Sequence, residues 1–168
     1  MAIGSSIQRA STALHAFDVD GLYIILSKQD VPDRYHWGIY FHTGPSGWIY
    51  HCTRVADSWF LDSHLSTNII YSLSMVAALK IAIVDHPQMK DALKARIPQV
   101  PLSNTTRYGP LTCRTWVLRV VDELNIEGHI SLKPGTSVEN VEAEATLKAT
   151  RAAANSTQTI DKSSFSIA

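Results

Sequence analysis

The feature that most constrains the fold is a pair of strand-like segments that flank a short turn. Residues 35–43 and 48–55 are rich in aromatic and β-branched side chains, and the four residues between them read Gly-Pro-Ser-Gly. Glycine and proline at such a position end one strand and permit the tight reversal that starts the next. The pattern predicts an antiparallel β-hairpin.

The rest of the chain alternates between strand-like and helix-like patterns. The predicted helices are residues 73–84, 86–97, 113–125 and 137–153, and the further predicted strands are residues 21–28 and 129–133. Thr112 suits the N-cap of the third helix, and Gly128 suits its end. The last helix is rich in Glu, Ala and Lys, so we expect it on the surface. This mixture of elements predicts an α+β fold.

The length and the hydrophobic content predict one domain with a packed core. The chain has 168 residues, of which 45% are hydrophobic. We expect the domain to span residues 17–153. Residues 1–16 and 154–168 are rich in small and polar residues and lack an apolar period, so we expect flexible segments at both ends.

Charge and hydropathy exclude several kinds of partner. Fifteen basic residues balance fifteen acidic ones, which leaves no positive field for a nucleic-acid backbone. The longest apolar stretch, residues 73–84, contains a serine and a lysine and is too short to span a bilayer. Residues 1–16 lack the apolar segment of a signal peptide. We therefore expect a cytoplasmic protein with free thiols and no stable membrane anchor.

Cys113 is predicted to lie in the first turn of the helix that Thr112 caps. Unpaired backbone N–H groups and the positive end of the helix dipole favour a thiolate there, and a thiolate is a nucleophile. Trp116 and Val117 follow at helical spacing and place Cys113 on the apolar stripe, so we expect the thiol to face the sheet. A plain buried core cysteine is the alternative.

The predicted hairpin offers histidines as partners for this thiol. Successive side chains of a strand point to opposite faces. One face of the first strand therefore carries His36, Gly38, Tyr40 and His42. His51 of the second strand lies on the same face in two plausible registers, with Thr43 opposite Trp48 or with Phe41 opposite Ser46.

A cysteine, a histidine and a third orienting group are what thiol catalysis requires. Two half-buried strand histidines with hydrogen-bonded rings are the simpler alternative. A zinc site from the same residues is another, although the close paired spacing of structural zinc ligands is absent. Cys52 follows His51 but points to the opposite face, so we expect it in the core. Asp57, Asp62 and His64 fall in a predicted solvated connector, where one of them could orient a substrate.

The hairpin resembles that of a known family. The sequence His-Trp-Gly-Ile-Tyr at 36–40, followed by a glycine turn and Trp-Ile-Tyr-His at 48–51, is similar to the His-Trp-Ala-x-Tyr…Val-x-His hairpin of the lecithin retinol acyltransferase-like proteins. These belong to the permuted papain-like superfamily, in which the histidine strand precedes the cysteine helix. The resemblance implies a permuted papain-like fold, with an antiparallel sheet packed against the helix that bears the nucleophile. It also implies that Cys113 is the nucleophile, His36 the base and His51 the third member.

The resemblance has informative limits. The family reads Asn-Cys-Glu-His-Phe around its cysteine, whereas this chain reads Thr-Cys-Arg-Thr-Trp, which is closer to uncharacterised cysteine-containing proteins of fungi. The membrane-anchoring C-terminal segment of the family has no counterpart in the polar residues 155–168. The resemblance therefore implies the superfamily and leaves the substrate open.

The expected function is cysteine-dependent acyl transfer by a hydrolase, an acyltransferase or a cyclase. The partner would be a small-molecule or peptide substrate with an amide, ester or thioester group, and no cofactor or metal is expected. The predicted substrate-binding residues are Trp37, Gly38, Tyr40, Thr112 and Trp116. A non-catalytic module that binds a small ligand or a protein on the hairpin face is the alternative, and a metal-dependent enzyme is a third possibility.

Overall fold

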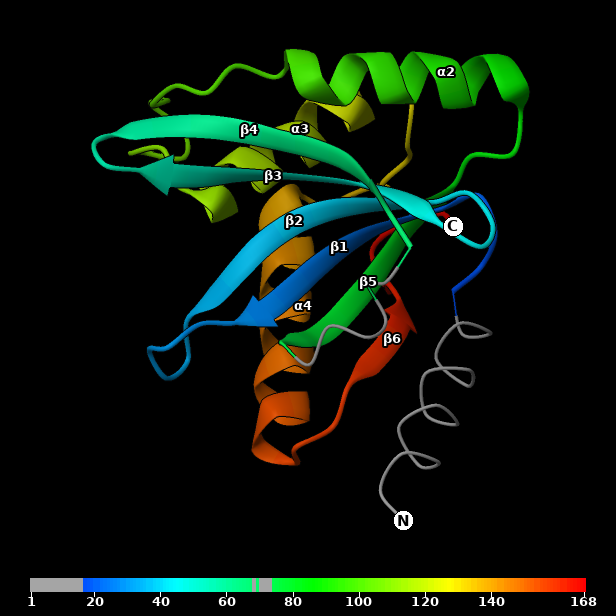
Figure 1. Cartoon of the computed structure of the whole chain (residues 1–168). Coiled ribbons are helices and arrows are strands. Elements are labelled where there is room, and N and C mark those ends of the chain that lie inside the picture. Colours follow the sequence, from blue (N-terminus) through cyan, green and yellow to red (C-terminus); the bar gives the residue numbers. More distant parts are fainter. Residues whose placement is uncertain (1–16, 68, 70–73) are drawn as a thin grey trace.

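The computed structural model describes residues 17–67, 69 and 74–168, and the predicted flexible segment 1–16 lies outside them. One sheet with helices packed on one side makes up the fold (Figure 1). The strands are β1 (Gly21–Lys28), β2 (Tyr35–His42), β3 (Gly47–Val55), β4 (Ser58–Ser66), β5 (Met75–Ile83) and β6 (Thr159–Lys162), and the helices are α2 (Pro87–Arg96), the short 3-10 helix η2 (Ile97–Gln99), α3 (Cys113–Ile126) and α4 (Val138–Ala154). The predicted α+β class is confirmed.

The six strands follow the order β4-β3-β2-β1-β5-β6. Neighbouring strands are antiparallel, apart from the parallel pair β5 and β6. The predicted hairpin is confirmed as β2 and β3. Its turn begins at Gly44, whose φ of 139° is a conformation that other residues rarely adopt.

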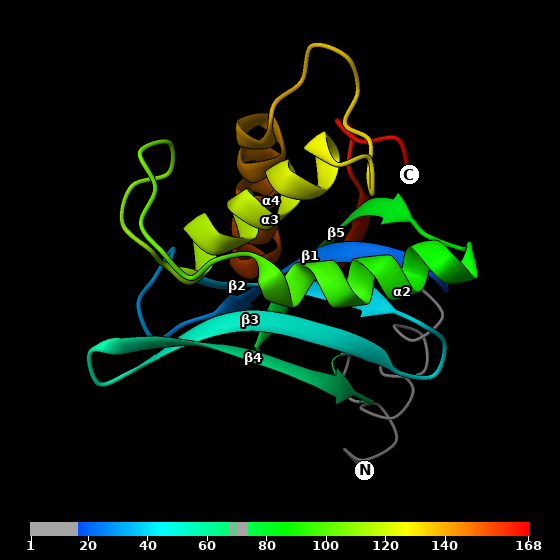
Figure 2. The same cartoon turned by 90° about the horizontal axis from the view of Figure 1, so that it is seen from above.

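One face of the sheet packs against α3 and α4 and forms the main core (Figure 2). The strands contribute every second residue to this core, as expected for a sheet with two different faces. These strand residues include Leu22, Ile24 and Leu26 of β1, Trp37, Ile39 and Phe41 of β2, and Tyr50 and Cys52 of β3. We call this side the helix-covered face. The buried indole of Trp116 on α3 donates a hydrogen bond to the Val100 carbonyl at 3.2 Å.

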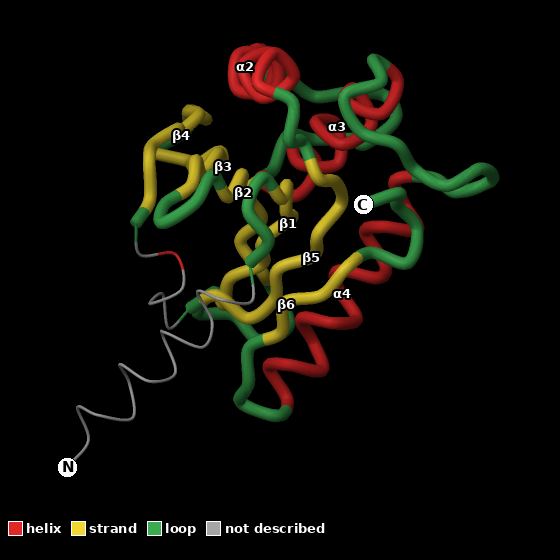
Figure 3. Tube along the Cα trace, turned by 90° about the vertical axis from the view of Figure 1, so that its right-hand side faces the viewer, coloured by secondary structure: helices red, strands yellow, loops and turns green. Residues whose placement is uncertain are grey.

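The other side of the sheet carries the polar residues of the hairpin. We call it the histidine face, and it includes His36, Gly38, Tyr40 and His42 of β2, Ile49 and His51 of β3, and Asp62 and His64 of β4. The helices α3 and α4 lie on the opposite side of the strands (Figure 3). A smaller aromatic cluster covers part of this face, where the Phe17 ring lies 4.9 Å from the Tyr23 ring and 5.4 Å from the Tyr40 ring.

The predicted helix over residues 73–84 is wrong, because β5 occupies residues 75–83 as a strand. β5 lies between β1 and β6, and nearly all of its side chains are buried. A strand that is buried on both faces is apolar at every position rather than at alternate ones. Such a run contains apolar residues at helical spacing by default, so its periodicity does not distinguish strand from helix.

The predicted solvated connector after the hairpin is also a strand. β4 pairs with β3 in full antiparallel register from Ser58 to Ser66. A tight reversal that includes Ala56, with a φ of 51°, joins the two strands. β4 forms one edge of the sheet, and polar side chains are typical of edge strands because they discourage pairing with other chains.

The predicted flexible tail 154–168 is wrong as well. Residues 159–162 form β6, and Ser163 and Ser166 are buried. Glu144 of α4 accepts hydrogen bonds from the Ser163 hydroxyl at 2.7 Å and from the Ser164 amide at 2.8 Å. This segment is held by polar contacts and strand pairing, which an apolar pattern does not reveal. The predicted strand 129–133 is reduced to one bridge between Leu132 and Ser166.

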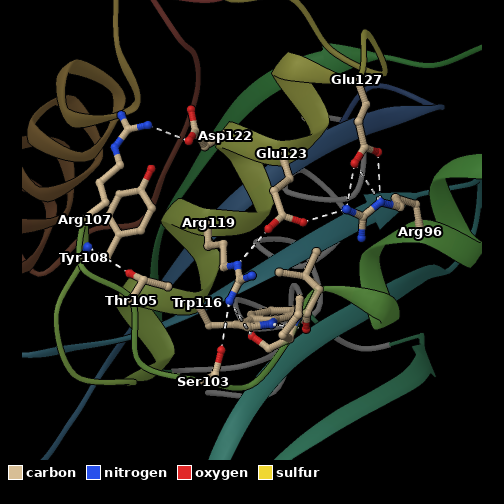
Figure 4. Close-up of polar contacts among 12 residues, drawn as sticks. Arg96, Ser103, Thr105, Arg107, Tyr108, Trp116, Arg119, Asp122, Glu123 and Glu127 are labelled. Carbon is tan, nitrogen blue, oxygen red and sulfur yellow. Dashed lines mark hydrogen bonds and ion pairs between the residues drawn. The ribbon is translucent and has the colours of Figure 1, made fainter.

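The other predicted helices are confirmed, and arginines join them. Arg96 at the end of α2 bonds Glu123 of α3 and Glu127, the C-cap residue of α3, with nitrogen–oxygen distances of 2.6 to 3.0 Å (Figure 4). Arg119 bonds the other oxygen of Glu123 at 2.7 Å, and Arg107 bonds Asp122 at 2.6 Å. These ion pairs fix α2 and the following loop against the outer side of α3. The predicted surface helix, α4, buries a stripe of alanines and valines against the sheet.

Candidate functional site

The register of the hairpin brings the two predicted histidines to one face. Ile39 pairs with Tyr50, and Phe41 pairs with Trp48. This register lies between the two predicted ones and is shifted from each by an even number of residues. Such a shift keeps every side chain on its face, so His36 and His51 share a face as predicted. A Cβ atom built on Gly38 would lie 3.4 Å from the Cβ of His51, which confirms that the two residues are adjacent on this face.

Four side chains on the histidine face form a continuous hydrogen-bonded chain across three strands. His36 Nε2 lies 2.8 Å from His51 Nδ1. His51 Nε2 lies 3.0 Å from Asp62 Oδ2, and Asp62 Oδ1 lies 3.1 Å from His64 Nδ1. We call these four residues the imidazole–carboxylate chain. Both ring nitrogens of His51 are occupied, so its orientation is fixed from two sides.

The chain runs from a half-buried end to an exposed end. The side chain of His51 is 18% exposed, whereas those of Asp62 and His64 are 48% and 50% exposed. Burial lowers the pKa of His36, and the neighbouring His51 lowers it further. The hydrogen bond from His64 lowers the pKa of Asp62, and His51 acts in the same direction. The arrangement therefore favours a neutral imidazole at one end and a carboxylate near the other.

Cys113 begins α3 as predicted, in the first turn after Thr112. The Thr112 hydroxyl accepts a hydrogen bond from the Thr115 amide at 3.1 Å, and the Thr115 hydroxyl accepts one from the Thr112 amide at 2.8 Å. This reciprocal pair is a capping box, which fixes where the helix starts. The thiol packs against the main core and is partly exposed.

The thiol and the two histidines lie on opposite faces of the sheet. Cys113 belongs with the helix-covered face, where its neighbour is the buried Cys52. Burial raises the pKa of the Cys52 thiol to about 12, and the charge of a Cys113 thiolate adds to the effect. His36 and His51 point away from this face by strand alternation. The predicted grouping of Cys113 with His36 and His51 is therefore wrong.

Most of the predicted substrate-binding residues have structural roles. Trp37 and Trp116 are buried in the main core, and Tyr40 is buried with its hydroxyl 2.9 Å from His42 Nδ1. Thr112 is occupied as the helix cap. Gly38 is the predicted residue that remains next to the imidazole–carboxylate chain.

Asp62 and His64 were predicted to lie in a solvated loop where one of them could orient a substrate, and their place beside His51 was not predicted. The signal that could have identified them is their spacing, because residues two apart in a strand lie on the same face. Asp62 is also directly opposite His51 in the β3–β4 register. His51, Asp62 and His64 each offer a ligand atom, and these atoms all lie within 4.8 Å of one another. The set can therefore transfer protons, bind a polar ligand or hold a metal ion.

Comparison with known proteins identifies a family. A family model described as "Family of unknown function (DUF6540)" matches residues 22–131, which is more than half of the chain. The chain belongs to the DUF6540 family. The DUF6540 match begins in β1 and ends beyond α3, so it includes the imidazole–carboxylate chain and Cys113. No curated protein and no solved structure matches the chain. Within the part of this DUF6540 protein that the structure describes, none of the helices has the length and apolar character needed to cross a membrane.

Proposed function

We propose that this DUF6540 protein is a non-catalytic binding module whose ligand site is the imidazole–carboxylate chain. The order of a histidine hairpin followed by a cysteine helix supports a scaffold of the permuted papain-like type. The observation that carries the proposal is the separation of Cys113 from His36 and His51 by the sheet. The hairpin face would then serve in recognition rather than in acyl transfer.

Acyl transfer by a thiol needs a base within hydrogen-bonding reach of the sulfur. The titratable side chain next to Cys113 on the helix-covered face is Cys52, and a buried thiol with a raised pKa does not act as a base near neutral pH. The histidine that would have served, His36, is bonded to His51 on the other side. This arrangement argues against the expected cysteine-dependent enzyme.

The histidine face has the chemistry of a recognition site for a small polar ligand. Its four linked side chains offer both hydrogen-bond donors and acceptors, and those of Asp62 and His64 are half exposed. Gly38 keeps the surface low beside His51, and the exposed ring of Phe60 on β4 adds an apolar neighbour on the same face. Sites of this kind combine a few fixed polar groups with apolar surface.

Thiol labelling tests this proposal against the enzyme. The full chain, its His36→Ala variant and a His86→Ala control are treated with iodoacetamide at neutral pH, and the labelled cysteines are mapped over time. His86 is the exposed N-cap residue of α2 and is not part of the imidazole–carboxylate chain. We expect Cys113 to label at the same rate in all three proteins, because no base acts on it. We expect Cys52 to be spared because it is buried.

The opposite result is equally clear. Labelling of Cys113 much faster than that of free glutathione, with a loss of this advantage in His36→Ala and not in His86→Ala, would restore the thiol enzyme and overturn the binding module.

A further inference from the structure

We infer that His51, Asp62 and His64 form a binding site for a divalent transition-metal ion of the Zn²⁺ type. The inference deepens the proposed function, because it names the ligand of the same face and rests on that face being a binding site. It is carried by the positions of three ligand atoms on two paired strands, His51 Nε2 on β3 and an Asp62 oxygen and His64 Nδ1 on β4.

The spacing of these atoms suits coordination. His51 Nε2 and Asp62 Oδ2 lie 3.0 Å apart, and Asp62 Oδ1 and His64 Nδ1 lie 3.1 Å apart. Around a tetrahedral ion with bonds of about 2.0–2.1 Å, neighbouring ligand atoms are separated by about 3.3 Å. All three atoms already fall within 4.8 Å of one another, so small side-chain rotations would bring them around one ion.

The backbone under this site is regular strand. Asp62 is directly opposite His51 across the β3–β4 ladder, and His64 follows two residues later on the same face. Ligands on paired strands are positioned more rigidly than ligands on loops, which favours a preformed site. The half-exposed side chains of Asp62 and His64 leave a path for an ion to enter.

His36 supplies the outer partner that a metal-bound histidine needs. When Nε2 of His51 binds a metal, its Nδ1 must carry a hydrogen and donate it. The atom 2.8 Å from Nδ1 is His36 Nε2, which accepts this hydrogen when the ring is neutral. His36 is thus a positioning residue that fixes the tautomer and ring orientation of His51, and it does not bind the ion itself.

The ligand set also selects the class of ion. Two imidazoles and one carboxylate suit Zn²⁺, Co²⁺, Ni²⁺ and Fe²⁺, whereas Mg²⁺ and Ca²⁺ prefer oxygen ligands alone. Three protein ligands leave at least one position for water or for a ligand atom. The two thiols lie on the other face of the sheet and do not join the site.

Cobalt titration of the metal-free full chain tests the inference. We expect one equivalent of Co²⁺ to produce visible absorption bands of a low-coordinate site, and Zn²⁺ to displace it. His64→Ala and Asp62→Asn should each weaken the binding of Co²⁺ by more than about tenfold, and His36→Ala by about 10- to 100-fold. His36→Gln, whose amide oxygen can still accept from His51, should retain part of the affinity. His86→Ala should bind as the parent protein does.

Circular dichroism verifies that each variant is folded before titration. No Co²⁺ bands at millimolar metal, or equal binding by the parent and His64→Ala, would overturn the metal site. The proposed function is tested independently, because it fails only if the labelling of Cys113 depends on His36. Loss of metal binding with His36-independent labelling would leave the binding module standing and remove the ion as its ligand.

Discussion

Gly38 and His51 are adjacent on neighbouring strands, so close that a Cβ on residue 38 would lie 3.4 Å from that of His51 and 3.3 Å from the Tyr50 carbonyl oxygen. A second glycine of the hairpin is more crowded. A Cβ on Gly47 would lie only 2.6 Å from the Phe41 carbonyl oxygen and would press on the ring of Tyr40. The backbone can yield by a few tenths of an ångström at the first position but not by enough at the second.

The two glycines should therefore respond differently to alanine. We expect Gly38→Ala to lower the free energy of unfolding by less than about 1 kcal/mol and Gly47→Ala to lower it by about 3 kcal/mol. Urea unfolding followed by tryptophan fluorescence measures both. Equal losses in the two variants would show that the hairpin backbone is softer than this packing indicates.

The capping box of α3 gives a second prediction. Thr112→Ala removes the acceptor for the Thr115 amide, and we expect the free energy of unfolding to fall by about 1 kcal/mol. Thr112→Ser keeps the hydroxyl and should stay within about 0.5 kcal/mol of the parent. Chemical denaturation compares the three proteins. If Thr112→Ser loses as much as Thr112→Ala, the methyl group and not the cap stabilises this turn.

The arginine cluster beside α3 gives a third. Arg96 donates hydrogen bonds to both carboxylate oxygens of Glu127 and to one oxygen of Glu123. A lysine cannot reproduce this forked geometry. We expect Arg96→Lys to lower the urea midpoint of unfolding at low salt, and the difference from the parent to shrink at 1 M NaCl because salt screens exposed charges. The control is Arg54→Lys in the exposed pair with Asp57, which should leave the midpoint unchanged. A loss that is insensitive to salt would point to packing of the Arg96 stem instead.

A fourth prediction concerns pH. His42 is buried, and burial lowers its pKa, although Asp18 and Asp20 partly oppose the shift. In the unfolded chain the pKa of a histidine is about 6.5. At pH values between the folded and the unfolded pKa of His42, the unfolded state binds more protons than the folded state. The free energy of unfolding should therefore fall as the pH drops below about 6.5, and it should level off below the folded pKa.

The contribution of His42 to this change of the free energy of unfolding with pH can be isolated. We expect His42→Gln to show a smaller loss of stability between pH 7.5 and pH 5 than the parent protein, as measured by urea unfolding at each pH. Part of the slope should remain, because burial lowers the pKa of His36 in the same sense. His86→Gln, at an exposed position, should keep the full slope. An unchanged slope in His42→Gln would mean that the pKa of His42 is the same in the folded and the unfolded protein.

Local sequence patterns predicted the parts of the fold that depend on local chemistry. The glycine turn predicted the hairpin, alternation predicted that His36 and His51 share a face, and Thr112 predicted the start of α3. Strand alternation and helix periodicity each identify which residues share a face. Neither pattern predicts which face of the sheet a helix will cover. That face determines which strand residues lie near Cys113.

The missing information lay in the packing between elements. The apolar alternate residues of the hairpin, such as Trp37 and Ile39, form the face that α3 covers, and Cys113 lies on the stripe of α3 that meets it. Matching apolar face to apolar stripe would have placed Cys113 beside Cys52 rather than beside His36. The resemblance to a cysteine enzyme favoured the other pairing, which the tertiary arrangement does not make.

β6 has a consequence for how the protein is made. β5 is apolar on both sides, and one of its edges pairs with residues that come about eighty positions later in the chain. During synthesis this edge of β5 stays unpaired until the residues of β6 have been translated. The nascent chain is therefore exposed to misassembly while the residues between β5 and β6 are translated, and chaperones that shield unpaired strand edges would protect this segment.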